Sequence, residues 1–194
     1  LSGNHDIIVL TCKYPGESAL LDELPDNVEV RRAWDQNYYT SSDYKPAWLP
    51  SAVVEAMRIL ARNEIDLVYS YYSPMAPHLI ALLLKRLYGV PWIAHFSDAW
   101  VDNPYKPDGW RTSRAIERTI VRHADQLTVP TKRLATMFCD QYQLPTVDCH
   151  VVPNFVEPDE ISRLPVRERT DDTLRFTYIG NLYGLRTPDA LFAA

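Results

Sequence analysis

The sequence predicts an α/β fold: a Rossmann-like parallel sheet with helices on both faces. Short apolar runs rich in β-branched residues alternate with longer segments in which apolar residues recur every three or four positions. The run at residues 7–10 is apolar throughout, as in strands that are buried on both faces. Alternation of this kind builds strand–helix–strand crossovers, and these produce a parallel sheet.

Six strands are expected in the first part of the chain. Each is an apolar or β-branched run that follows a helical segment or a turn. They are expected at residues 7–10, 28–30, 66–71, 92–96, 126–129 and 150–152.

Helices are expected between these strands. Residues 50–62 carry one apolar stripe at helical spacing. Ser73 and Pro74 are interpreted as the N-cap and first residue of the next helix, and Gly89 as the residue that ends it. Two further helices are expected, over residues 113–123 and after the cap Thr131.

Composition divides the chain into three parts. Residues 1–156 form the Rossmann-like domain, and the charged, proline-containing residues 157–173 form a linker. Residues 174–194 are the first strand and the helix start of a second α/β domain. The chain begins without an initiator methionine and ends early in a helix. We therefore expect a fragment that lacks the first strand of its sheet and is inactive alone.

The overall composition excludes several classes of protein. Hydrophobic residues make up 46% of the 194 residues and charged residues 23%, as in soluble globular proteins. A net charge of -5 argues against a nucleic-acid-binding protein, which needs a basic face. The sequence has no signal peptide and no apolar run near the roughly 20 residues that span a bilayer. We expect a cytoplasmic protein, and peripheral attachment to the inner face of the membrane stays open.

Several familiar chemical motifs are absent from the sequence. It has no glycine-rich dinucleotide fingerprint, no P-loop and no nucleophile elbow. It also has no Asp-x-Asp pattern, with which many sugar transferases hold a divalent ion. We expect no metal and no cofactor.

The richest candidate site follows the strand at residues 92–96. In open parallel sheets, ligands bind beyond the carboxyl ends of the strands. His95, Ser97 and Asp98 are the candidate catalytic residues, because their side chains can bind sugar hydroxyls or transfer protons. Trp100 offers a face on which a sugar ring can stack. The structural alternatives are that Asp98 caps a turn and that Trp100 fills the edge of the sheet.

Further acceptor-binding candidates lie in the same region. Asp102, Asn103 and Tyr105 continue the loop with hydrogen-bonding groups, and Ser73 lies where backbone amides can receive a hydroxyl or an anion. A plain helix cap is the alternative for Ser73.

The order of motifs resembles glycosyltransferase family 4, a group of retaining enzymes with GT-B architecture. The resemblance is carried by the strand at residues 3–11 and by the Ser-Asp-x-Trp loop at residues 91–100. It is also carried by three later stretches, at residues 117–125, 151–156 and 178–184. Together these stretches cover nearly the whole chain in the family's order.

The resemblance implies transfer of a sugar from a nucleotide-sugar donor to a glycan or a lipid-linked acceptor, with retention and without a metal. It places Asn154 near the interdomain junction and Gly180 beside the donor diphosphate. Many members have Arg or Lys after that glycine, where this chain has Asn181, so Arg186 is expected to supply the positive charge. A catalytic histidine of some members falls nearer Ser97 than His95. The resemblance also implies a role in making surface polysaccharide or glycolipid.

Two other functions stay open. A sugar-nucleotide 2-epimerase shares the GT-B architecture, and an α/β module can bind carbohydrate or a partner without turnover. Residues of the donor domain distinguish these alternatives.

Overall fold

The computed structural model describes residues 5–12, 24–34, 46–101, 103, 110–145, 148–154, 162, 173, 177–180 and 187–192. Strands and helices alternate through most of this range. The strands are β1 (Ile7–Cys12), β2 (Val28–Ala33), β3 (Val68–Tyr72), β4 (Trp92–Phe96), β5 (Gln126–Val129) and β6 (Cys149–Val151). The helices are α1 (Leu49–Arg62), α2 (Ala76–Tyr88), α3 (Trp110–His123), α4 (Lys132–Tyr142) and α6 (Asp189–Phe192).

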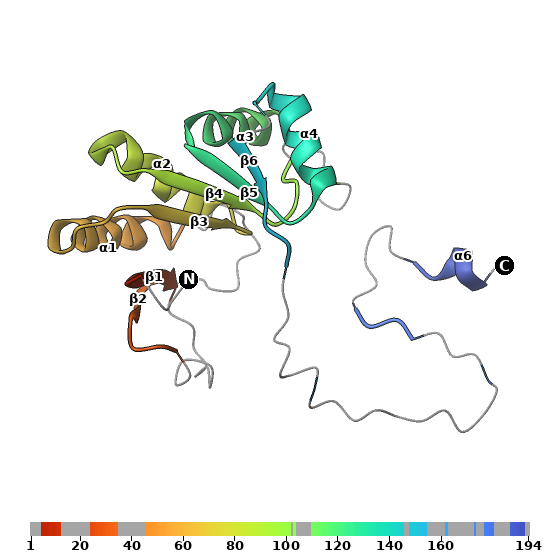
Figure 1. Ribbon diagram of the computed structural model, residues 1–194, viewed down its shortest axis with the longest axis horizontal. Helices are drawn as coiled ribbons and strands as arrows, with labels where there is room; N and C mark the ends of the chain where they lie inside the picture. Colours follow the sequence, from red (N-terminus) through yellow and green to blue (C-terminus); the bar gives the residue numbers. More distant parts are fainter. Residues whose placement is uncertain are drawn as a thin grey trace.

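The strands form two parallel sheets (Figure 1). Sheet A pairs β1 with β2, and sheet B has the order β3-β4-β5-β6. Every pairing is parallel, and each connection within sheet B contains a helix. The structure therefore confirms the α/β class expected from the sequence, parallel sheets with helices on both sides.

An apolar cluster joins the two sheets, and among the described residues no strand of one sheet pairs with a strand of the other. Among the described residues, β1 pairs only with β2, and the edge strand β3 pairs only with β4. Small and apolar side chains connect the sheets through α1 and α2. The cluster comprises Ala33, Trp48, Ala52, Ala56, Ala76, Ile80 and Leu84, with Leu10, Cys12 and Val68 packed against it.

A second cluster lies between sheet B and the helices α2, α3 and α4. Successive residues of a strand point to opposite faces, so Ala94 and Phe96 of β4 share the face that these helices cover. Phe138 of α4 packs against Phe96 with ring centroids 4.8 Å apart. Burial of these side chains packs the three helices onto sheet B.

Most element boundaries agree with the sequence prediction, with one correction at α2. Its N-cap is Met75, with no side-chain hydrogen bond, and the proline in its first turn is Pro77. Ser73 and Pro74 precede the helix, so their interpretation as its cap and first residue is wrong. The caps Gly89 and Thr131 are confirmed, since Gly89 is left-handed at φ 70° and Thr131 accepts a bond from Leu134 N.

The second domain is described only in part. Residues 174–176 of the expected strand lie outside the described residues, and residues 177–179 are not in a strand. The short helix α6 follows Thr187 and Pro188, residues typical of a helix start, and it lies in the segment where the sequence predicts one. Nearly all of the expected linker at 157–173 lies outside the described residues.

Candidate functional site

The candidate site is the carboxyl edge, which we define as the edge of sheet B where β3 to β6 end. The strand register aligns Tyr72 with Phe96 and Val129 with Val151, so neighbouring strands end level. The residues that follow these ends therefore gather along one edge, as expected for a ligand site of a parallel sheet. These residues include Ser73, Ser97, Asp98, Thr131 and Asn154.

Asp98 presents a free carboxylate at this edge. Its side chain is exposed, and no described residue gives it a hydrogen bond or an ion pair. The alternative in which Asp98 caps a turn therefore has no support within the described residues. A carboxylate in this setting is available to accept hydrogen bonds from ligand hydroxyls.

The other members of the loop after β4 are held by hydrogen bonds. Ser97 Oγ donates to the carbonyl of Tyr72 at 2.6 Å, which ties the loop to the end of β3. Asn103 Nδ2 donates to the carbonyl of Ala99 at 3.0 Å. Ser97 and Asn103 thus hold the loop beside Asp98 in place. This role does not depend on contact with a ligand.

A residue that the sequence analysis included in a family motif, without giving it a role, holds the same loop. Glu117 of α3 is fully buried, and its Oε2 accepts from the backbone N–H groups of Trp100 at 3.2 Å and Val101 at 3.0 Å. Its Oε1 accepts a hydrogen bond from the hydroxyl of Tyr142. The signal was present in the sequence, because Glu117 lies one turn before Ile120 and Val121 on the apolar stripe of α3.

Trp100 is part of the core, which corrects the expectation that it stacks on a sugar. Its side chain is 6% exposed and belongs to the apolar cluster of sheet B. A buried indole offers no face to a ligand. The alternative in which Trp100 fills the edge of the sheet describes it better.

His95 lies within the sheet, one residue before the end of β4. Its ring is 4% exposed and stacks on Tyr71 with centroids 4.7 Å apart, while its Nδ1 is 2.9 Å from Thr128 Oγ1. Burial lowers the pKa of His95, which favours the neutral ring. Its assignment as a catalytic residue stays a prediction, and the contacts described here are those of a packed side chain.

The remaining predicted residues divide into described and undescribed positions. Ser73 and Asn154 are exposed. Gly180 has φ 154°, a backbone conformation that residues with a Cβ rarely adopt, so this position favours glycine. Asp102, Tyr105, Asn181 and Arg186 lie outside the described residues.

Positive charge reaches the carboxyl edge from α4. Lys132 and Arg133 are exposed residues in the first turn of this helix, directly after Thr131. The N-terminus of a helix is the positive end of its dipole, and the two cations add to it, so the local potential there is positive. This part of the edge is suited to an anionic group of a substrate.

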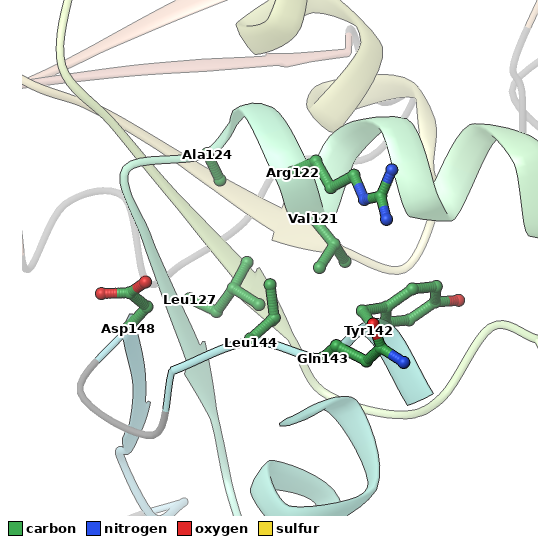
Figure 2. Close-up of a pocket in the computed structure, with 8 residues that line it drawn as sticks. All are labelled: Val121, Arg122, Ala124, Leu127, Tyr142, Gln143, Leu144 and Asp148. Atoms are coloured by element: carbon green, nitrogen blue, oxygen red, sulfur yellow. The ribbon is translucent and has the colours of Figure 1, made fainter. Parts of the chain in front are cut away.

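The cavity in Figure 2 lies away from this edge. It has a volume of about 270 Å³, and its lining includes Ala124 and Asp148, which precede β5 and β6. These residues belong to the amino ends of the strands. The cavity therefore does not contain the candidate site.

Within the described part of the chain, no three His, Cys, Asp or Glu side chains gather in a way that could hold a metal ion. No helix in that part is long and apolar enough to cross a membrane.

The family profile described as "Glycosyl transferase 4-like domain" matches residues 2–154. The chain belongs to this family. The match includes sheet A, sheet B, Asp98 and Glu117, and it ends at Asn154. It confirms the resemblance stated from the motifs.

Two solved structures of Anabaena Alr3699/HepE are similar to this glycosyl transferase 4-like chain. The first, in complex with UDP and glucose, has 14% sequence identity and a TM-score of 0.47, over 82% of this chain and 49% of that chain. The second, in complex with UDP-glucose, has 14% identity and a TM-score of 0.45, over 82% and 48%. This chain thus spans about half the length of these structures. No curated protein sequence matched.

Proposed function

We propose that this chain is the acceptor-side part of a glycosyltransferase that moves a sugar from a nucleotide-sugar to a glycan or a lipid-linked acceptor. The single observation that carries the proposal is the exposed carboxylate of Asp98 on an anchored loop at the carboxyl edge. Membership of the glycosyl transferase 4-like family supplies the class of reaction.

In this proposal Asp98 binds and orients the acceptor. Its two carboxylate oxygens accept hydrogen bonds from sugar hydroxyls, and a fixed loop holds the attacking hydroxyl in one direction. The reaction keeps the anomeric configuration of the donor and uses no catalytic metal. Lys132 and Arg133 bring positive charge to the same edge, and this charge attracts the anionic donor.

The setting of the reaction is part of the proposal. Residues 174–194 begin the donor-binding domain, in which Gly180, Asn181 and Arg186 approach the donor diphosphate. The enzyme works in the cytoplasm, at the inner face of the membrane when the acceptor is lipid-linked. Its product enters surface polysaccharide or glycolipid.

The test is transfer by the full-length protein with a panel of nucleotide-sugars that includes UDP-glucose. Asp98→Asn removes the charge and keeps the shape, so kcat/KM for transfer should fall by at least about a hundredfold. Asp140→Asn is the matched control, since Asp140 is an exposed residue of α4 away from the carboxyl edge and its replacement should leave transfer unchanged. Equal activity of Asp98→Asn and wild type would contradict the role of Asp98.

Analysis of the products separates the alternatives. A transferase yields a glycoside with the anomeric configuration of the donor, and EDTA leaves its rate unchanged. A 2-epimerase yields a changed nucleotide-sugar and no glycoside. Absence of both nucleotide binding and turnover in the full-length protein would identify a non-catalytic module and reject the transferase.

A further inference from the structure

Glu117 occupies a position that would normally hold an apolar residue. Its side chain is fully buried on α3, and one turn away lie the buried residues Ser113, Ile120 and Val121. Removing a carboxylate from water is strongly unfavourable unless hydrogen bonds replace the lost hydration. A leucine would fill the same space without that cost, so the acidic group needs an explanation beyond packing.

The hydrogen bonds of Glu117 connect three elements. Its Oε2 receives both backbone N–H groups of the loop after β4, at Trp100 and Val101, and its Oε1 receives the hydroxyl of Tyr142 at the end of α4. The two N–H groups converge on one oxygen of Glu117, which accepts both hydrogen bonds. A charged carboxylate oxygen binds them more strongly than a neutral acceptor does. The carboxylate therefore fixes the path of the loop relative to α3 and α4.

These bonds lie directly beside Asp98. One residue before Asp98, Ser97 is tied to the carbonyl of Tyr72, and two and three residues after it, Trp100 and Val101 are tied to Glu117. Asp98 is thus an exposed residue in a short segment whose two sides are both anchored. Loss of the bond at Ser97 or of the bonds to Glu117 would let the backbone of this segment move. The carboxylate of Asp98 would then move with it.

We infer that Glu117 is a positioning residue, which acts together with Tyr142 to hold the loop that presents Asp98 to the substrate. This inference rests on the proposed function for the part played by Asp98. The geometry of the loop is independent of it. Glu117 itself is buried and does not contact the substrate.

The structural test is amide NMR of the full-length protein with Tyr142→Phe and Glu117→Gln. Tyr142→Phe removes only the hydroxyl that holds Oε1, whereas Gln can still accept from both loop amides and donate to Tyr142. We expect the amide signals of Trp100 and Val101 to shift in both variants, and the signal of Asp98 to shift with them. Tyr88→Phe, at an exposed tyrosine of α2, is the matched control and should leave these signals in place. An unmoved Asp98 signal in both variants would overturn the inference.

The kinetic test asks whether Glu117 acts through Asp98. Displacement of a positioned group lowers kcat, so Tyr142→Phe should lower kcat on the order of tenfold while the KM for the donor stays the same. In the Asp98→Asn background, Tyr142→Phe should cause no further loss of kcat. Multiplied losses in the double variant would show that Glu117 and Tyr142 act independently of Asp98, against the inference.

The two arms distinguish the inference from the proposed function. If Asp98→Asn is fully active, the proposed function fails, and the NMR arm alone decides whether Glu117 positions the loop. If Asp98→Asn is inactive but Tyr142→Phe leaves kcat and the loop signals unchanged, the inference fails and the proposed function stands.

Discussion

At the scale of single residues, the buried side chains of Ser70, His78 and Trp92 form one hydrogen-bonded group. Ser70 Oγ accepts from the indole N–H of Trp92 at 2.7 Å, so its own hydroxyl proton is free for His78 Nδ1 at 2.6 Å. This assigns the remaining proton of a neutral His78 to Nε2. The ring of His78 packs against the ring of Phe96, with centroids 4.6 Å apart. Burial is the main cause that lowers the pKa of His78 to about 3.

The low pKa of His78 should make stability depend on pH. Between pH 6.5 and about 3 the unfolded chain binds a proton at this residue and the folded chain does not, so stability falls as the pH falls through this window. The slope from this residue approaches about 1.4 kcal/mol per pH unit. Urea unfolding at several pH values should show a smaller slope for His78→Gln than for wild type. His123→Gln, at an exposed histidine of α3, should keep the wild-type slope.

The sequence predicted the exposure of Asp98 better than it predicted the contacts around it, and the role of Asp98 stays a prediction. Asp98 was found because it follows a strand, and the structure leaves it exposed at that edge. Trp100 was misassigned, because sequence spacing does not show whether an indole turns toward solvent or toward the core. The role of Glu117 depends on a loop and a second helix that meet it only in three dimensions.

At the scale of elements, caps and apolar periodicity predicted the helices well. Thr131 is a β-region N-cap whose side chain accepts from Leu134 N at 3.2 Å. The start of α2 was missed because Ser73 and Pro74 have the composition of a cap without its geometry. Serine followed by proline is compatible with a helix start. The direction of the backbone after β3 decides at which residue the helix begins.

The cap of α4 gives a prediction for this helix. Thr131→Ala removes the acceptor for Leu134 N and should lower the free energy of unfolding by about 0.5 to 2 kcal/mol. Thr136→Ala, at an exposed position inside the same helix, should change it by about 0.5 kcal/mol or less. Chemical denaturation of the three proteins measures both differences, and equal midpoints for Thr131→Ala and wild type would show that the cap is not needed.

At the scale of the whole molecule, the unpaired edges of β1 and β3 are the feature that most favours association with other chains. Within the described residues neither strand has a hydrogen-bonded neighbour on its second side. Large apolar side chains on these strands are also exposed, with Val9 at 40%, Tyr69 at 54% and Tyr71 at 49%. Exposed strand edges of this kind template association with other chains.

The 194-residue chain expressed alone should therefore aggregate. A charge on a free edge strand opposes edge-to-edge pairing, so Val9→Lys should increase the monomer fraction in size-exclusion chromatography. Val54→Lys is the matched control, because Val54 is an exposed residue of α1 and not of a strand edge. A chain that is monomeric and melts cooperatively without any substitution would disprove this expectation.

The apolar cluster that joins the two sheets affects which substitutions the site tolerates. Apolar contact has no preferred direction, so sheet A can adjust on α1 and α2 when its side chains change. The strands of sheet B are instead held at fixed heights by ladder hydrogen bonds. Ser73, Asp98 and Asn154 all follow strands of sheet B, so within the described residues substitutions in β1 or β2 act on this edge mainly through the apolar cluster. We therefore expect that substitutions in β1 and β2 leave the alignment of the strand ends at the carboxyl edge unchanged.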